Sequence, residues 1–251
     1  MKNIVLSLLL FLTLPLYAEG EILKIAVTGF NPPFIMQGTD KLLYGFDITM
    51  MNAICDLIKR SCQYQIVPPP DLIPDVQTKK VDLALSMTIT LERSTLVNFS
   101  LPYLLSNSLF LGKKDIATKP FQAAMLNGQT IGVVRGTIFI DIANSLGIKN
   151  ARIVQFKQLD SVISALNDGE IDVALMDEPS ARYWQLQTSN NLIVLGKPIV
   201  YGYGLGIAIN KEEPNLLIQV NNALLQYQNS DDYRQNYDRY MVHFRNGQSI
   251  Q

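Results

Sequence analysis

"KKVDLALSM" (79–87) and "GEIDVALMD" (169–177) are two near-identical stretches whose repetition decides the fold of this chain. In each, polar residues that end a helical pattern lead into a run of hydrophobic residue, Asp, hydrophobic residue, Ala and Leu. A short apolar run of this kind is typical of a strand buried within a sheet. Another apolar strand that runs into a glycine turn precedes each repeat, at 22–30 and 129–137. The shared order predicts two similar α/β lobes, with a chance likeness of short apolar strands as the alternative.

The chain is long enough for two lobes, with 251 residues of which 48% are hydrophobic. Two extended stretches without a helical pattern, 102–114 and 198–210, are expected to cross between the lobes. We therefore expect lobe 1 to comprise 19–105 and 202–251, and lobe 2 to comprise 106–201. The glycines of the second stretch do not indicate a nucleotide-binding loop, because neither a helix start nor a Lys-Ser/Thr pair follows them.

The first 18 residues have the pattern of a cleaved secretory signal peptide, with Lys2, an apolar run over 4–14 and a small residue, Ala18, at the end. We expect export to a bacterial periplasm. A membrane anchor is the alternative, but the apolar run is short of the roughly 20 residues that span a bilayer. Loss of Lys2 would leave 20 Lys and Arg against 22 Asp and Glu, a balance that argues against a nucleic-acid partner.

The two cysteines, Cys55 and Cys62, are seven residues apart. On one continuous helix their Cα atoms would lie about 10 Å apart, which is beyond the reach of a disulfide. The stretch 45–61 predicts a helix with Asp47 near its N-terminus, followed by a strand over 63–67. A disulfide from the helix's last turn to that strand is therefore predicted, with two free buried thiols as the alternative.

Polar residues follow both repeated strands. Because ligands of open α/β sheets bind outside the carboxyl ends of strands, these residues form a candidate site. The first strand delivers Ser86, Met87 and Thr88 to that end, with Arg93 shortly after, and the second delivers Asp177.

The chemistry of this candidate site matches the head group of an amino acid. The planar guanidinium of Arg93 can bind a carboxylate through two hydrogen bonds. Gly136 and Thr137 form a turn that opens a helix, where free backbone N–H groups favour an anion. Asp177 offers a carboxylate for an ammonium group. Each residue has an alternative, since Arg93 could pair with Glu92 or Asp82 and Asp177 could cap the helix that starts at Pro179.

Three stretches, 45–54, 72–103 and 169–178, resemble the periplasmic amino-acid-binding proteins of polar amino-acid ABC transporters, solute-binding protein family 3. The likeness runs over the whole mature chain and is greatest to the lysine/arginine/ornithine branch, with glutamine binders nearby. It implies an α/β, two-lobe periplasmic-binding-protein fold of type II, in which two crossing strands form the hinge. It also implies a monomer without a cofactor that captures a polar L-amino acid, basic ones such as arginine included, and delivers it to an inner-membrane ABC permease.

The resemblance also implies roles for single residues. Arg93 and Thr88 would hold the α-carboxylate, and the backbone carbonyl of Ser86 would accept from the α-ammonium. Asp177 would bind the α-ammonium. Thr137 and Ile138 would offer backbone N–H groups to the carboxylate, although Ile138 replaces a usual threonine.

The pocket for the ligand's side chain departs from the pattern of the branch. Thr28 replaces an aspartate, while Asn31 and Pro69 replace aromatic residues. A guanidinium would lose its charge partner and its stacking faces, so the branch's ligand does not transfer. Another aromatic wall could come from Phe30, Phe34 or Tyr44, with core packing as the alternative for each. The full set of predicted ligand-binding residues is Thr28, Asn31, Ser86, Met87, Thr88, Arg93, Thr137, Ile138 and Asp177.

Two other functions share this fold: a sensory or interaction protein, and a periplasmic enzyme that resembles cyclohexadienyl dehydratase. We expect no catalytic residues and no metal site, because the one histidine, His243, lies far along the chain from the strand ends. Glu178, beside Asp177, could act as a general acid. The sequence indicates no second carboxylate whose shifted pKa would suit it to act with Glu178 in catalysis.

Overall fold

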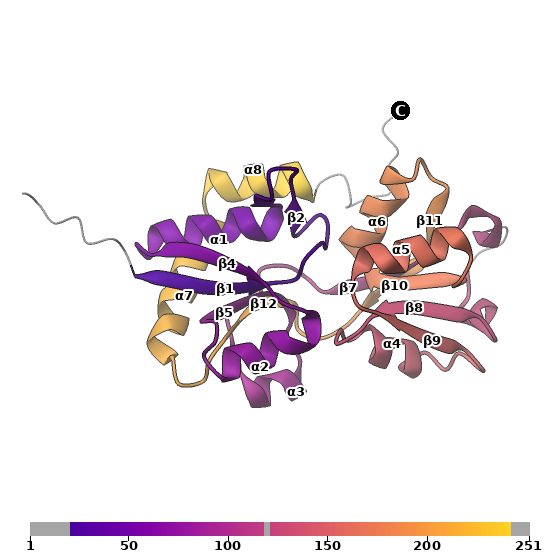
Figure 1. Cartoon of the computed structure of the whole chain (residues 1–251), viewed down its shortest axis with the longest axis horizontal. Helices are drawn as coiled ribbons and strands as arrows, with labels where there is room; N and C mark the ends of the chain where they lie inside the picture. Colours follow the sequence, from indigo (N-terminus) through magenta and orange to yellow (C-terminus); the bar gives the residue numbers. More distant parts are fainter. Residues whose placement is uncertain (1–20, 118–120, 242–251) are drawn as a thin grey trace, which may run out of the picture.

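Two five-stranded sheets, each covered by helices, make up the computed structural model (Figure 1). The structure describes residues 21–117 and 121–241. The predicted signal peptide, 1–18, and His243 lie outside these residues. Within the described part of the chain, no helix has the length and apolarity needed to cross a membrane.

Lobe 1 is built on the first sheet, whose strand order is β4-β1-β5-β12-β6. These strands are β1 (Ile22–Val27), β4 (Ser61–Ile66), β5 (Leu83–Thr88), β6 (Asn98–Phe99) and β12 (Leu205–Ile209). Its helices are α1 (Phe46–Leu57), α2 (Leu72–Gln77), α3 (Leu91–Leu96), α7 (Pro214–Gln228) and α8 (Asp231–Tyr240). A short hairpin of β2 (Met36–Gln37) and β3 (Leu43–Tyr44) and a 3-10 turn, Pro69–Asp71, complete it.

Lobe 2 is built on the second sheet, whose strand order is β11-β7-β10-β8-β9. These strands are β7 (Asn107–Lys113), β8 (Thr130–Val134), β9 (Arg152–Phe156), β10 (Val173–Asp177) and β11 (Leu192–Val200). Its helices are α4 (Phe139–Ser145), α5 (Leu159–Asp168) and α6 (Glu178–Gln187), with 3-10 turns at Lys114–Ala117 and Ala123–Leu126. The chain passes from one sheet to the other near the two predicted crossing stretches. The predicted residue limits of the lobes stay predictions.

The two sheets repeat one arrangement, as the repeated sequence predicts. In lobe 1 the order β4-β1-β5 is parallel and β12 then runs antiparallel to β5. In lobe 2 the order β9-β8-β10 is parallel and β7 then runs antiparallel to β10. The registers correspond, since Ile25 lies opposite Leu83 and Ile131 lies opposite Val173. Each repeated strand is therefore parallel to one neighbour and antiparallel to the other.

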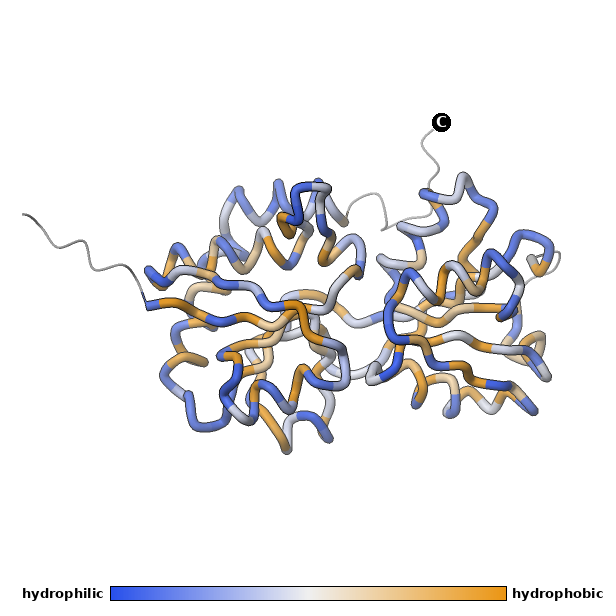
Figure 2. Tube along the Cα trace, viewed as in Figure 1, coloured by the Kyte–Doolittle hydropathy of each residue, from blue (hydrophilic) through white to orange (hydrophobic). Residues whose placement is uncertain are grey.

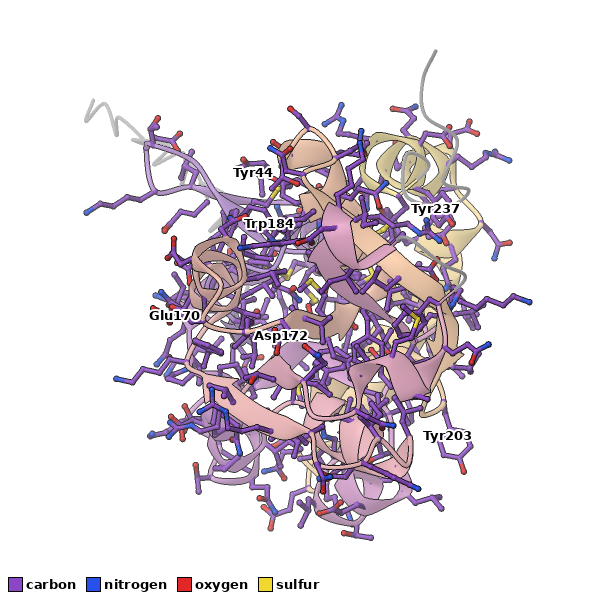
Figure 3. All side chains as sticks on the ribbon, turned by 90° about the vertical axis from the view of Figure 1, so that its right-hand side faces the viewer. Tyr44, Glu170, Asp172, Trp184, Tyr203 and Tyr237 are labelled. Atoms are coloured by element: carbon purple, nitrogen blue, oxygen red, sulfur yellow. A yellow bond between two sulfur atoms is a disulfide. The ribbon has the colours of Figure 1, made fainter. Side chains whose placement is uncertain are left out.

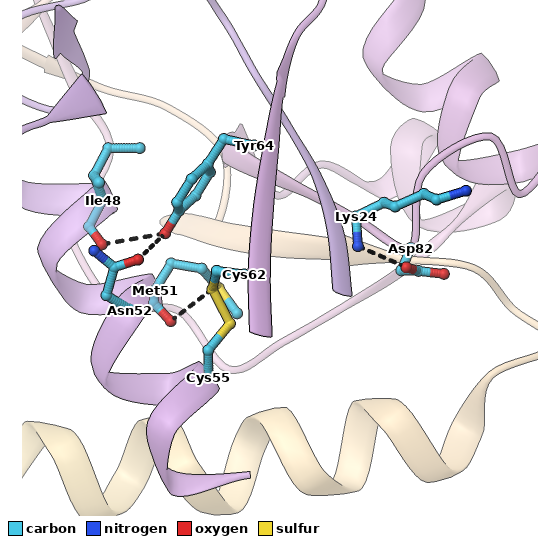
Figure 4. The surroundings of a disulfide bond; sticks show 8 residues. All are labelled: Lys24, Ile48, Met51, Asn52, Cys55, Cys62, Tyr64 and Asp82. Atoms are coloured by element: carbon cyan, nitrogen blue, oxygen red, sulfur yellow. Dashed lines mark hydrogen bonds between the residues drawn. A yellow bond between two sulfur atoms is a disulfide. The ribbon is translucent and has the colours of Figure 1, made fainter. Parts of the chain in front are cut away.

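An aspartate in each repeat joins the repeated strand to the strand before it. In lobe 1 the Asp82 carboxylate accepts the N–H of Lys24 at 2.8 Å (Figure 4). The Asp82 N–H donates to the carbonyl of Lys24, also at 2.8 Å. In lobe 2 the Asp172 carboxylate accepts the N–H of Thr130 at 2.7 Å, and its own N–H donates to that residue's carbonyl at 3.0 Å. The polar residue inside each apolar run thus fixes the start of a strand pair.

Each sheet packs apolar side chains on both faces, and Figure 2 shows hydrophobic residues concentrated along the strands. In lobe 1, Ile25 belongs to the core that includes α1 and α7, while the adjacent Ala26 belongs to the core that includes α2. In lobe 2, Ala174 packs with α5 and α6, while Leu175 packs with α4. Each sheet is therefore the central layer of its lobe, with a packed core on either face.

The predicted disulfide is confirmed. Cys55 lies in the last turns of α1 and Cys62 in β4, and their Cα atoms are 6.0 Å apart (Figure 4). The chain turns back between them through Lys59, whose φ of 57° is left-handed, and the N–H of Arg60 donates to the carbonyl of Cys55 at 3.0 Å. The strand begins at Ser61, two residues before the predicted start.

The tyrosines of the last described helix pack inward. Tyr233, Tyr237 and Tyr240 lie against the larger core of lobe 1, and Tyr237 is labelled in Figure 3. The ring of Phe46, at the start of α1, contacts Tyr233 and Tyr237 edge-on, with centroids 6.3 and 6.4 Å apart. α8 is therefore part of the lobe 1 core.

Candidate ligand-binding site

All nine predicted ligand-binding residues line one small cavity of about 60 Å³ between the lobes. The rest of its lining comes from Pro69, Leu72, Gly136 and Phe139. The carboxyl ends of β5 and β10 meet at this cavity, because the two sheets present the same edge to each other.

On the lobe 1 side, Ser86 is held in an unusual conformation. Its φ of 57° is left-handed, which side-chain-bearing residues adopt only where surrounding contacts fix it. Its hydroxyl donates to the Asp47 carboxylate, and its N–H donates to the hydroxyl of Tyr103 at 3.2 Å. That hydroxyl donates in turn to Asp47 at 2.9 Å. A buried three-residue network therefore sets the direction of the backbone at the end of β5.

Asp47 is the buried acceptor of this network. Its side chain is fully buried, and burial raises the pKa of its carboxyl to about 7, although hydrogen bonds from Ser86 and Tyr103 act to lower it. Its second carboxylate oxygen has no hydrogen-bond partner among the described residues. The sequence predicted Asp47 only as a residue near the start of a helix, and no pattern there signals its contact with Ser86, 39 residues away.

Arg93 reaches across the cleft from the first turns of α3. Its Nη1 donates to the carbonyl of Thr88 at 3.2 Å, and its Nη2 donates to the carbonyl of Gly136 in lobe 2 at 3.3 Å. Thr90 caps the helix by accepting the N–H of Arg93 at 3.1 Å, which fixes the start of α3. Burial lowers the pKa of the guanidinium, which nonetheless stays charged. Within the described residues Arg93 forms no ion pair, so the alternative pairing with Glu92 or Asp82 is wrong.

Asp177 ends β10 and occupies the N-cap position of α6, but its side chain makes no capping hydrogen bond. Instead its carboxylate accepts from the hydroxyl of Tyr201 at 2.5 Å. Burial raises the pKa of Asp177 to about 6, while the hydrogen bond from Tyr201, the charge of Arg93 and a hydrogen bond from Asn31 act to lower it. The alternative in which this side chain serves as a helix cap is therefore wrong.

Tyr201 is a site residue that the sequence did not identify. It follows β11 in the second predicted crossing stretch. Its hydroxyl donates to the Asp177 carboxylate and accepts from the Thr88 hydroxyl, so it joins the ends of the two repeated strands. Its near neighbour Tyr203 is 61% exposed and projects from the surface (Figure 3). The two tyrosines are indistinguishable in sequence pattern, so only the structure separates them.

The Gly136 turn of lobe 2 lies directly against lobe 1. Its φ of 79° is left-handed, and a Cβ added there would lie 2.7 Å from the backbone nitrogen of Pro70. Beside it, the Thr137 hydroxyl donates to the carbonyl of Val134 at 2.6 Å, so that side chain is turned into its own loop. Ile138 occupies the N-cap position of α4, so the helix begins at Phe139. This start is one residue later than that of a helix opened by Thr137. Glycine at 136 is thus required for the close approach of the lobes.

A larger cavity of about 540 Å³ adjoins the small one. The two share the lining residues Thr28, Asn31, Pro69, Thr137, Phe139 and Asp177. The buried hydroxyl of Thr28 has no hydrogen-bond partner among the described residues. The carboxamide oxygen of Asn31 accepts from Ser180 of lobe 2 at 3.1 Å. The site therefore continues outward from the strand ends into a second, roomier compartment.

The proposed aromatic wall is not formed by all three candidates. Phe34 is 1% exposed and belongs to the core of lobe 1, and Tyr44 lies on the β2–β3 hairpin and is 45% exposed. Phe30 lines the larger cavity and contacts Trp184 of lobe 2 edge-on, with centroids 6.1 Å apart. Core packing is thus confirmed for Phe34, while Phe30 lies at the site.

Two α/β lobes joined by crossing segments, with a polar cavity between their strand ends, define a type II periplasmic-binding-protein fold. The chain belongs to the bacterial extracellular solute-binding proteins, family 3, whose model matches residues 23–118 and 114–243. It is 30% identical to "ABC transporter arginine-binding protein 1" of Escherichia coli (strain K12), over 96% of this chain and 99% of that protein.

Further relatives bear other names within the family. The chain is 28% identical to the "Histidine-binding periplasmic protein" of Salmonella typhimurium (strain LT2), over 93% of this chain and 94% of that one. A solved arginine transport system periplasmic binding protein from Legionella pneumophila superimposes with a TM-score of 0.81 at 31% identity, over 88% of this chain and 100% of that structure. These relatives are binding proteins.

Proposed function

We propose that this protein is a periplasmic receptor that captures a polar L-amino acid between its lobes and delivers it to an inner-membrane ABC permease. Arg93 would bind the α-carboxylate, with the Thr88 hydroxyl and the Gly136–Thr137 turn beside it. Asp177 and the backbone carbonyl of Ser86 would bind the α-ammonium. The names of the relatives support transport of amino acids as the setting.

The observation that carries this proposal is the meeting of opposite charges at one small cavity. A half-buried guanidinium from lobe 1 and a half-buried carboxylate from lobe 2 line it together. An amino-acid zwitterion would supply the counter-charge to each. Both groups are desolvated, so charge-assisted hydrogen bonds to a ligand would be strong there.

Hydrogen bonds between the lobes at the candidate site also support a receptor that closes on its ligand. Arg93 and Asn31 of lobe 1 already form hydrogen bonds with Gly136 and Ser180 of lobe 2. A ligand that binds both lobes stabilises the closed arrangement by its differential affinity for it.

Isothermal titration calorimetry with the twenty L-amino acids and ornithine tests the proposal. We expect at least one to bind, and we expect Arg93→Ala and Asp177→Ala each to weaken that binding by at least about a thousandfold, because each leaves a buried charge of the ligand unpaired. Arg152→Ala and Asp168→Ala are matched controls, since both residues are exposed in lobe 2 and outside the cavity. Wild-type affinity in either site variant, or a folded wild type that binds no amino acid, would overturn the proposal.

We also propose that the protein is not an enzyme, in keeping with relatives named as binding proteins. Incubation of the purified protein with prephenate, followed by ultraviolet absorbance of the aromatic product, checks this. We expect no turnover above the spontaneous rate. Turnover that Asp177→Asn abolishes would establish the dehydratase-like alternative instead.

A further inference from the structure

The larger cavity has an uneven distribution of charge. Arg135 and Lys157 line it from the lobe 2 side, and Asp177 is its only carboxylate among the described lining residues. Asp177 already accepts from Tyr201, and the proposed function assigns it to the ligand's α-ammonium. Beyond the head group, the compartment therefore offers positive charge and no negative charge.

The two cations have no counter-ion in the described part of the chain. Neither Arg135 nor Lys157 takes part in any of its ion pairs. Both residues are exposed, which keeps their charges solvated while the cavity is open to water. A ligand group that enters the compartment would meet both charges at reduced hydration.

The uncharged polar groups of the lining also act as donors. Asn31 has its carboxamide oxygen engaged by Ser180 and donates one N–H to Asp177, which leaves its second N–H for another partner. The Thr28 hydroxyl is buried and without a partner, so it has an O–H to donate. A buried hydroxyl without a hydrogen bond is costly, and a ligand acceptor would remove that cost.

A cationic side chain suits this compartment poorly. A guanidinium or ammonium group would be enclosed beside two like charges and without a free carboxylate, and both conditions disfavour its charged form. A carboxamide or carboxylate would instead accept from the donors of the lining. The volume of about 540 Å³ is ample for such a side chain.

We propose that this site takes an amino acid whose side chain ends in a hydrogen-bond acceptor and carries no positive charge, glutamine and glutamate being the fitting examples. The inference rests on the proposed function, because it assumes that the small cavity holds the head group. It departs from the arginine and histidine named for the relatives. Arg135, Lys157, Thr28 and Asn31 are the residues that would determine this specificity.

Calorimetry with L-glutamine, L-glutamate, L-leucine, L-arginine, L-lysine, L-ornithine and L-histidine tests the inference. We expect glutamine or glutamate to bind at least about 100-fold more tightly than any of the cationic amino acids and more tightly than leucine. Tightest binding of a cationic amino acid or of leucine would overturn this inference while leaving the proposed function intact. Binding of no amino acid would overturn both.

Two variants test the named residues. Thr28→Asp places a carboxylate in the compartment, and Lys157→Glu reverses the charge of an exposed residue of its lining. Each should raise the affinity for arginine relative to glutamine by at least about tenfold. Lys149→Glu is the control, because it makes the same charge change at an exposed lobe 2 residue outside the lining and should leave the ratio unchanged. An unchanged ratio in Lys157→Glu, or an equal change in Lys149→Glu, would overturn the specificity role.

Discussion

The ends of the two repeated strands differ, although the strands themselves correspond. β5 and β10 occupy the same position in their sheets and share the same aspartate hydrogen bonds to the preceding strand. β5 ends in hydroxyl residues followed by Arg93, whereas β10 ends in Asp177. The sheet therefore determines where the site lies, and the few residues past each strand determine which charge each lobe contributes.

This division explains how one scaffold binds a dipolar ligand. At the small cavity each lobe presents a single sign of charge, so neither alone satisfies both ends of a zwitterion. Bringing the strand ends together places the guanidinium and the carboxylate around one cavity. Four predictions test the comparison of the lobes, from the largest effect to the smallest.

Gly136→Ala tests whether the lobe 2 turn must contact lobe 1. The added Cβ would clash with Pro70, so we expect ligand affinity, measured by calorimetry, to fall by at least about 100-fold. Gly147→Ala is a matched control in the same lobe, because Gly147 also has a left-handed φ, 66°, but its Cβ would meet nothing within 4 Å. Both variants should lose some stability, and only the first should lose affinity. Equal affinities in the two variants would refute the closure role of the turn.

Replacing Cys55 and Cys62 together by alanine tests how much the disulfide between α1 and β4 stabilises lobe 1. Closing so short a loop restricts the unfolded chain, so the free energy of unfolding in urea should fall by about 2 to 3 kcal/mol. Ligand affinity should stay within twofold, because Cys62 lies near the start of β4, at the end opposite the site. A variant as stable as the oxidised wild type would contradict the first expectation, and a large loss of affinity the second.

The pH dependence of affinity tests the lobe 2 carboxylate. The pKa of Asp177 is raised to about 6, so its carboxylate is mostly ionised at pH 7 and becomes protonated as the pH falls through 6. Ligand affinity should therefore be full at pH 7.5 and about tenfold weaker at pH 5. Calorimetry at several pH values measures this. Asp177→Asn should bind weakly with no such decline, whereas a wild-type profile that is flat between pH 7.5 and 5 would show that this carboxylate does not bind the ligand's ammonium.

Asp82→Ala and Asp172→Ala test the correspondence of the sheets. Each removes a side-chain hydrogen bond to a backbone N–H of the neighbouring strand, so each should lower the free energy of unfolding by about 1 kcal/mol. Urea denaturation measures the loss. The effect of Asp172→Ala should be the larger, since its hydrogen bond is partly buried and that of Asp82 is exposed. Asp168→Ala, at an exposed carboxylate, should change stability little, and a matching loss there would remove the special role of the two aspartates.

The sequence predicts those parts of the molecule that depend on local pattern. Repetition of "VDLAL" and "IDVAL" predicted the central strands, and apolar spacing predicted α1 and its disulfide to the next strand. The site residues could be collected because parallel strands bring their carboxyl ends to one edge. Seven of the nine predicted residues lie within a few positions of β1, β5 or β10, where this rule applies.

Contacts between residues far apart in sequence were beyond such reasoning. The network of Ser86, Asp47 and Tyr103 joins residues 17 to 56 positions apart. The residues that flank Ser86 in the sequence do not signal its left-handed φ. The choice of Tyr201 over Tyr203 depends on the exact path of the chain after β11. Arg93 was predicted to bind a carboxylate, while its hydrogen bond to the Gly136 carbonyl requires the relative placement of both lobes.

The position of β12 has a consequence for how the molecule is completed. β12 lies between β5 and β6, yet it is made after every strand of lobe 2. The chain is synthesised from the N-terminus onward. Once β11 has been made, all five strands of lobe 2 are present, while lobe 1 still lacks β12, an inner strand of its sheet. Lobe 2 can therefore be cut out as one continuous fragment. Lobe 1 cannot, and its last inner strand arrives only when the chain has returned from the other half of the molecule.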